Sequence, residues 1–554
     1  MKKVLYLLLL LLVTACSETP KSAENSFSAI NAYHYHSGTV YFSGRLTGTP
    51  DGKFPKGITL LGSNIFTDED VAVEIPVGDD GTFAADVHIP HSLDFYVRTG
   101  DYVDGLYFFV GDSVNVTMDL ASEKTIVSPG SICYWIYNYK DTIMESYKRT
   151  YAGKDNIYKI AREGSIEEVE NFCREIAKVT EQHINDVNAG TFALPEDVDP
   201  IAAEILKSDA VMMGFNTLLN VRFTYDNRRS VAVYDSVTGG YVPKMNPDFR
   251  PLDQEWMDGF LKRNERMLLD NPMAIFSSHI GGIVNLLRFG LFDSYIFYRN
   301  DVLLGAKREN SQEYKNYVYD FTLPTDYNAA LLKEILPLRA DTLYTFGDYL
   351  AQVTQNLEKE SGISSSCFMS QLCIMQNVFG ELDDDDITAD QAAAFFAGAL
   401  PFINHPVAAH HYIQAYRAYV RKNESSGASG NVVADAVLNR IIEPYKGNVL
   451  FLDFWNMACG PCRGGMMRQR GLVKSLESEP VKFLYITEEK YRDDSEKWLG
   501  ETEIKGEHIY ISTDDWNHLQ TYLNFSGIPF TCIIDKDGGL HRDKECSDIQ
   551  NFLK

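Results

Sequence analysis

The chain is predicted to be a multidomain protein with an N-terminal all-β sandwich, a central mainly α-helical region and a C-terminal α/β domain. Three observations predict this fold class. Apolar residues alternate with polar ones near the N-terminus, recur at helical spacing through the middle of the chain, and form short strands separated by helical patterns after a Gly/Ser-rich segment. The length of 554 residues agrees with this division, because an average domain takes roughly 150 residues.

The composition narrows the class of protein. Hydrophobic residues make up 45% and charged residues 23% of the chain, which is ordinary for a globular protein and excludes wholesale disorder. The net charge of −26 argues against nucleic acid as a partner, because phosphate binding needs a basic surface. Nine cysteines are too few for a disulfide-stapled scaffold, so any cysteine chemistry must come from a particular pair.

The first residues are predicted to be a targeting segment and not part of the fold. Two lysines precede a run of ten apolar residues, 4–13, which is too short to span a bilayer, so residues 1–15 are interpreted as a signal peptide. The segment ending at Cys16 resembles a bacterial lipobox, in which the cysteine is acylated; an ordinary signal peptide with a chance cysteine is the alternative. Residues 16–33 are then the lipidated cysteine and a tether. We expect a periplasmic, lipid-anchored protein, with the outer membrane as the expected site.

Residues 34–120 are predicted to form the β-sandwich. Apolar residues alternate with polar ones in 71–75, 83–89 and 114–118, and Asp- and Gly-containing turn signals separate these runs. The segment holds no grouping of side chains typical of catalysis. It is therefore interpreted as a packing or recognition module.

Residues 131–422 are predicted to be mainly α-helical. Ser165 and Glu168 have the spacing of a capping box, and apolar residues follow them on one helix face. No function is predicted for this region.

A Gly/Ser-rich linker at 423–431 leads to the last region, 432–554, which is predicted to be an α/β domain. Short apolar strands alternate there with helical patterns, which predicts a mixed sheet with helices on both faces. The predicted strands are 449–454, 481–486, 508–511, 530–534 and 540–542, and the predicted helices are 461–478 and 515–523.

A Cys-Gly-Pro-Cys sequence, Cys459 to Cys462, lies where the first of these strands ends and a helix begins. Residues i and i+3 on the first turn of a helix have Cβ atoms about 5–6 Å apart, so a disulfide can close and open there with little backbone movement. Pro461 is tolerated because first-turn amides have no partner within the helix. The helix N-terminus also favours a thiolate and lowers the cysteine pKa. The spacing therefore predicts a redox-active cysteine pair.

Half of a zinc site is the competing hypothesis for this pair. Zinc would need two more ligands, and the later cysteines, Cys532 and Cys546, are separated by thirteen residues instead of two. No metal site is therefore predicted, and no cofactor besides the redox-active disulfide.

Two segments of this region resemble a known family. Residues 451–463 (FLDFWNMACGPCR) resemble the active-site strand and turn of thioredoxin-like proteins, especially the membrane-anchored TlpA-like thiol–disulfide oxidoreductases. Residues 527–530 (GIPF), followed by 533–538 (IIDKDG), resemble the family's cis-proline loop and next strand. The resemblance covers 432–554, about a fifth of the chain. The order of a lipoprotein signal, a β module, a helical region and this domain also resembles secreted proteins of Bacteroides-type bacteria.

The resemblance implies roles for individual residues. Cys459 would be the exposed nucleophile, Cys462 the resolving thiol, and Asp453 a buried acid that assists Cys462; a purely structural carboxylate is the alternative for Asp453. Ala458 replaces the tryptophan usual before the first cysteine, which puts the range of partners in doubt. The residues expected to contact a substrate are Trp455, Gly460, Pro461, Ile528 and Pro529.

The function implied is disulfide exchange with envelope proteins. The expected partners are protein disulfides or dithiols, a membrane electron donor or acceptor, and the membrane itself through the lipid anchor. A peroxidase of the same fold is disfavoured because Asn456 stands where peroxiredoxins place a threonine. The alternative from another class is a non-catalytic binding lipoprotein in which the cysteine pair is a structural disulfide.

Overall fold

The computed structural model describes residues 35–49, 52–150, 157–235, 240–288, 364, 366–382, 396, 399–425, 435–502, 504–525, 527–542 and 544–553. The predicted signal peptide, Cys16 and the tether lie outside these residues. The chain divides into two compact units: one takes residues 1–36, 65–68 and 135–416, and the other takes 37–64, 69–134 and 417–554.

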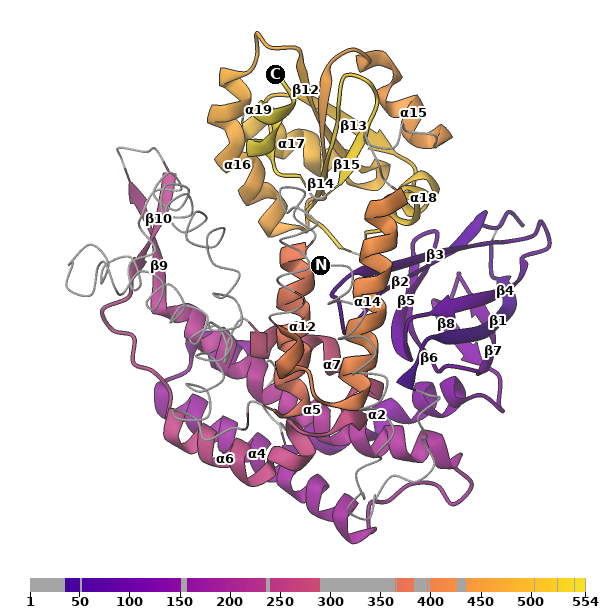
Figure 1. Ribbon diagram of the computed structural model, residues 1–554, viewed down its shortest axis with the longest axis vertical. Helices are drawn as coiled ribbons and strands as arrows, with labels where there is room; N and C mark the ends of the chain where they lie inside the picture. The colour runs from indigo at the N-terminus through magenta and orange to yellow at the C-terminus, as the bar shows by residue number, and fades with distance from the viewer. Residues whose placement is uncertain are drawn as a thin grey trace, which may run out of the picture. The chain divides into compact units, whose positions relative to one another are not determined.

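The N-terminal part of the second unit is a β-sandwich, called the β module below (residues 38–127). One sheet has the order β4-β1-β7-β8 and the other β3-β2-β5-β6 (Figure 1). The rings of Phe42 and Phe108, one from each sheet, lie 5.0 Å apart and join the two layers. The last strand lies beyond the predicted boundary at residue 120. The strands are β1 (Gly38–Thr47), β2 (Gly57–Ser63), β3 (Asp70–Pro76), β4 (Thr82–Ile89), β5 (Leu93–Thr99), β6 (Tyr102–Phe108), β7 (Ser113–Asp119) and β8 (Lys124–Val127).

The first unit is mainly helical, with one hairpin of β9 (Ser230–Asp235) and β10 (Gly240–Met245) that the sequence did not predict. The predicted capping box is confirmed, because the Glu168 amide donates to Ser165 Oγ and the Ser165 amide donates to Glu168 Oε2. Within the described ranges, no helix has the length and apolar character needed to cross a membrane. The helices that lie wholly or partly in this unit are α2 (Ile132–Thr150), α3 (Ile157–Glu163), α4 (Ile166–Ala189), α5 (Pro200–Asp226), α6 (Gln254–Leu268), α7 (Ile280–Leu286), α12 (Phe368–Leu382) and α14 (Pro406–Ser425).

Helix α14 ends at Ser425, so the first residues of the predicted linker are helical. The remainder of that linker lies outside the described residues. The part that follows, called the C-terminal domain below, comprises the described residues from 435 to 553.

The C-terminal domain is a five-stranded mixed sheet with helices on both faces (Figure 1). The strand order is β13-β12-β11-β14-β15. The first three strands run parallel, β14 pairs antiparallel with β11, and β15 pairs antiparallel with β14. The strands are β11 (Val449–Phe454), β12 (Val481–Glu488), β13 (Glu507–Ile511), β14 (Phe530–Ile534) and β15 (Leu540–Arg542). The helices are α15 (Ala436–Ile442), α16 (Gly460–Ser475), α17 (Arg492–Thr502), α18 (Thr513–Leu523) and α19 (Ile549–Phe552).

The central strand β11 divides the apolar core of this domain. Every residue of β11 is buried, and alternate side chains point to opposite faces of the sheet. Leu450, Leu452 and Phe454 pack in the core that α15 and α18 cover. Val449 and Phe451 pack in the other core, together with side chains of α16. Because α16 begins just after β11, the Cys-Gly-Pro-Cys turn lies at the carboxyl end of the central strand.

Candidate redox-active site

Cys459 and Cys462 form a disulfide on the first turn of α16, with their Cα atoms 5.4 Å apart. Cys459 is the N-cap residue of the helix, and the Cys462 amide donates to Cys459 Sγ at 3.1 Å. The Cys459 amide donates to Asn456 Oδ1 at 2.9 Å, which holds the turn before the helix. First-turn amides have no partner within the helix and stabilise negative charge, so this position favours a thiolate at Cys459 once the disulfide is reduced.

The two cysteines differ in exposure. Cys459 keeps 9% of its surface exposed and Cys462 keeps 1%, while Gly460 and Pro461 between them are exposed. Cys462 is therefore inside the domain, and Cys459, although largely buried, is the more exposed of the two cysteines.

The predicted proline loop lies beside Cys459. The Ile528–Pro529 peptide bond is cis, and the carbonyl oxygen of Ile528 lies 3.7 Å from Cys459 Sγ. Ile528 is half-buried and Pro529 is exposed. The structure thus brings together Cys459, Ile528 and Pro529, which are distant in sequence, next to the exposed turn at Gly460 and Pro461.

Asp453 lies on β11, on the side of the sheet that carries Cys462. Asp453 is 3% exposed, and among the described residues its Oδ1 has no hydrogen-bond partner. Burial disfavours the charged form and raises the pKa of Asp453 to about 7. A carboxyl with this pKa can take up or release a proton near neutral pH.

Trp455 was predicted to contact a substrate, but its side chain is fully buried. It packs in the same core as both cysteines, and its ring lies 5.6 Å from that of Trp498 on α17. In this arrangement Trp455 supports the disulfide from inside the domain and takes no part in the exposed surface.

Two further residues lie near Asp453: Tyr485, which was not singled out from the sequence, and Cys546, which was considered there only as a zinc ligand. Tyr485 on β12 is the direct strand neighbour of Asp453, and its buried hydroxyl finds no hydrogen-bond partner in the described part of the chain. Cys546, in the short helix η8 (Cys546–Asp548), packs in the core of the disulfide. Burial, with Asp453 as a further cause, raises the pKa of Tyr485 and brings that of Cys546 to about 12. Both groups are therefore neutral near pH 7. The apolar run at 481–486 predicted the strand that carries Tyr485, and nothing in the sequence indicated that Cys546 packs beside the disulfide.

The structure separates the cysteines that a zinc site would need. Cys532 on β14 packs in the core under α18, whereas Cys546 packs with the disulfide on the opposite face of the sheet. Across the part of the chain that the structure describes, no group of three or more His, Cys, Asp or Glu side chains is arranged to hold a metal ion.

No protein-family model and no curated protein matches the sequence. About a fifth of the chain is similar to solved thioredoxin-fold thiol–disulfide oxidoreductases. One is the thioredoxin domain of a thiol–disulfide oxidoreductase from Bacteroides vulgatus, with 16% identity, 20% of this chain and 84% of that chain covered, and a TM-score of 0.20. A thiol:disulfide interchange protein from Bacteroides sp. has 20% identity, 22% and 86% coverage, and a TM-score of 0.19. A thioredoxin-family thiol:disulfide interchange protein from Chlorobium tepidum has 18% identity, 20% and 81% coverage, and a TM-score of 0.18.

Proposed function

We propose that the chain is a thiol–disulfide oxidoreductase that exchanges disulfides with envelope proteins through Cys459 and Cys462. The observation that carries the proposal is the geometry of this pair: a disulfide on the first turn of a helix, in which the first cysteine is more exposed than the second. The adjoining Ile528–Pro529 loop and the buried carboxyl of Asp453 supply a contact surface and a proton acceptor.

The reduced form acts in two steps. The Cys459 thiolate attacks one sulfur of a substrate disulfide, a mixed disulfide forms, and the other substrate sulfur leaves as a thiolate. Cys462 then loses its proton to the Asp453 carboxylate and attacks Cys459 Sγ. The Cys459–Cys462 disulfide forms, the second substrate thiolate leaves, and two electrons have passed to the substrate. The same steps in reverse oxidise a substrate dithiol.

The proposal extends to location and partners. Residues 1–15 are a signal peptide that is removed, and acylated Cys16 anchors the protein in the periplasm at the outer membrane; the lipobox-like stretch before Cys16 supports this. Its partners are protein disulfides or dithiols and a membrane electron donor or acceptor. The chemistry requires no organic cofactor or metal. The divisions at 34–120, 131–422 and 432–554 are proposed as its functional regions.

Substitution of each cysteine tests the mechanism. Cys462→Ser leaves an attacking thiolate that cannot be released from within the protein, so mixed disulfides with envelope proteins should accumulate and disappear on reduction. Cys459→Ser removes the accessible nucleophile and should trap little. The other described cysteines contribute the same background to both variants, since all are buried: Cys133, Cys173, Cys367, Cys373, Cys532 and Cys546.

The readout is non-reducing electrophoresis of acid-quenched cells. Trapping that is equal in the two variants, or absent from both, would contradict the proposal. It would favour a non-catalytic binding lipoprotein in which Cys459–Cys462 is a structural disulfide.

A further inference from the structure

One contact between the β module and the C-terminal domain is made by α18, and Lys490 Nζ, which donates to Asp101 Oδ1 at 2.8 Å, makes another. The Arg98 guanidinium on β5 donates to Asn517 Oδ1 at 3.2 Å and to Gln520 Oε1 at 2.9 Å. Asn517 and Gln520 are 5% and 4% exposed, so these amide side chains are buried at the contact. Buried amides that are paired with a guanidinium specify one arrangement of the two parts, because an unpaired polar group there would be costly.

The residue after α18 binds the edge of a β-module sheet. β3 is the outer strand of its sheet, with β2 on its inner side. The Ala72 amide of β3 donates to Asn524 Oδ1 at 3.2 Å, and Asn524 Nδ2 donates to the Asp70 carbonyl at 2.9 Å. The Ala72 amide is therefore protected by the C-terminal domain and not by its own sheet, which makes it a reporter of the contact.

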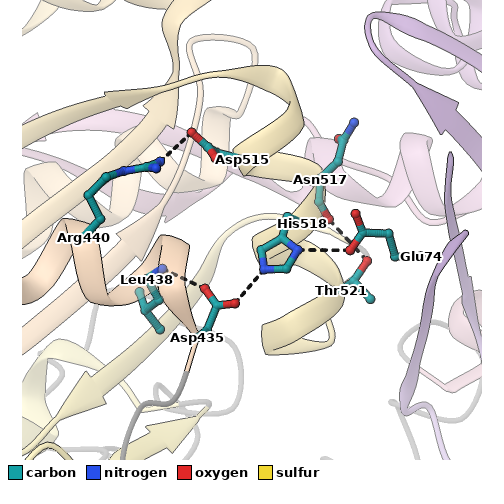
Figure 2. Close-up of polar contacts among 8 residues, drawn as sticks. All are labelled: Glu74, Asp435, Leu438, Arg440, Asp515, Asn517, His518 and Thr521. Carbon is teal, nitrogen blue, oxygen red and sulfur yellow. Dashed lines mark hydrogen bonds and ion pairs between the residues drawn. The ribbon is translucent and has the colours of Figure 1, made fainter. Parts of the chain in front are cut away.

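His518 lies between two carboxylates that come from different parts of the chain (Figure 2). Its Nδ1 is 3.0 Å from Glu74 Oε2 on β3, and its Nε2 is 2.6 Å from Asp435 Oδ2. Asp435 is the N-cap of α15 and accepts a hydrogen bond from the Leu438 amide. A neutral imidazole carries one N–H and can donate to only one carboxylate, whereas an imidazolium donates from both nitrogens. With both carboxylates ionised, the two contacts are hydrogen bonds together only when His518 is protonated.

We propose that His518 is a proton-dependent clasp that fastens the β module to the C-terminal domain by joining Glu74 to Asp435. Loss of the proton removes one of the two charge-assisted hydrogen bonds and leaves two carboxylates facing a neutral ring. The contact is then weaker, and the edge strand β3 is held less firmly.

The charged surroundings of His518 fit this role. On its own helix, Asp514 and Asp515 are acidic, and Asp515 is paired with Arg440 of α15 at 2.7 Å. From the β module, Lys56 acts on Asp514, and Arg98 is engaged by the amides described above. The hydrogen bonds and charges of Asp435 and Glu74 raise the pKa of His518 against the opposing effect of burial. A raised pKa in the docked state means that protonation stabilises the contact at low pH and that this stabilisation is lost as pH rises through the His518 pKa.

The clasp does not depend on the redox chemistry. α18 packs in the core on the face of the sheet opposite to the disulfide. Deprotonation of His518 is therefore expected to change how the two parts are held together and not the attack by Cys459.

Hydrogen exchange of the full chain, read by mass spectrometry at pH 5.5 and pH 8.0, tests the clasp. Exchange times are scaled for the intrinsic effect of pH, and the peptide spanning residues 70–76 is followed. The loss of one charge-assisted hydrogen bond of ordinary strength changes an equilibrium constant roughly tenfold. The corrected exchange of the 70–76 peptide should therefore be about tenfold faster at pH 8.0 than at pH 5.5. Glu74→Gln should abolish this difference and exchange at the faster rate at both pH values.

His541→Gln is the matched control. His541 also contacts a carboxylate, Asp535, at 2.9 Å, but this pair lies within the β14–β15 hairpin, so the variant should keep the wild-type pH difference. Equal corrected exchange at the two pH values in the wild type, or an unchanged difference in Glu74→Gln, would overturn the clasp. The pKa of His518 can also be measured by NMR from the ring-carbon chemical shifts, with the His518 signal assigned as the one missing in His518→Gln. A pKa at or below the ordinary histidine value of about 6.5 would overturn the clasp as well.

Discussion

Replacing Asp453 with asparagine keeps the size of the side chain and removes its ionisation. Burial raises the pKa of Asp453 from 3.8 to about 7 in the folded protein. Below pH 3.8 Asp453 carries its proton in the folded and the unfolded chain, so folding buries no charge at this residue. Between pH 3.8 and 7 the unfolded chain ionises and the folded chain does not, so the free energy of unfolding of the wild type falls as pH rises.

The magnitude follows from the two pKa values. Each tenfold change in proton affinity is worth about 1.4 kcal/mol. The raised pKa of Asp453 therefore lowers the free energy of unfolding by about 4 kcal/mol at pH 8 and by between about 1 and 2 kcal/mol at pH 5. Asp453→Asn should therefore be more stable than the wild type at pH 8, and the gain should shrink by about 2–3 kcal/mol at pH 5.

Urea unfolding of the oxidised protein, followed by tryptophan fluorescence, measures this difference. Trp455, Trp498 and Trp516 report on the C-terminal domain, and they are three of the five tryptophans in the chain. Asp537→Asn is the control, because Asp537 is exposed and its substitution should change little at either pH. A gain at pH 8 that is no larger than the gain at pH 5 would refute the argument that Asp453 is destabilised by burial of its charge.

The same variant separates a catalytic from a structural role. An asparagine cannot accept the Cys462 proton, so the resolution step should slow near pH 7. Stopped-flow exchange with a model disulfide measures it. Kinetics that do not change between pH 6 and 9 would leave Asp453 with a structural role alone.

Two further predictions concern the anchor and the packing of the C-terminal domain. Cys16→Ser should block incorporation of labelled fatty acid and release the protein from membranes or prevent its processing; a native protein that is soluble and unlabelled would contradict the anchor. Gly506 has φ +136°, and a Cβ atom there would lie 2.9 Å from the Phe483 carbonyl oxygen, so Gly506→Ala should lower the free energy of unfolding by about 1–3 kcal/mol. Gly500→Ala, where a Cβ meets nothing within 4 Å on helix α17, should instead raise it by about 0.5–1 kcal/mol; equal effects in a urea titration would contradict the steric argument.

The elements that flank the disulfide were predictable because their patterns are local. Strands β11 and β14 have the predicted bounds, since a strand buried on both faces reads as a short continuous apolar run. The cysteine spacing and the proline loop are also local patterns. Their meeting beside Cys459 was expected only from the family resemblance, because no local pattern brings residues 459 and 528 together.

Other elements have weak local patterns. Helix α17 was not predicted because its sequence RDDSEKWLGET places few apolar residues on a helical face. In β1, Gly44 interrupts the alternation of apolar residues; a Cβ atom there would lie 2.1 Å from the Val116 carbonyl oxygen, so the close approach of β7 requires glycine. The site of His518 was out of reach of sequence patterns because Glu74 is 444 residues away along the chain.

The binding of Asn524 to the edge of β3 also bears on how the protein is made. Asn524 and Ala72 are 452 residues apart, so the β module emerges from the ribosome long before the residue that covers its outer strand. An open strand edge is a template for pairing with other chains, and nascent multidomain proteins are exposed to such misassembly. Chains truncated ahead of the C-terminal domain would keep β3 uncovered, and they should aggregate by strand addition even though every residue of the β module is present.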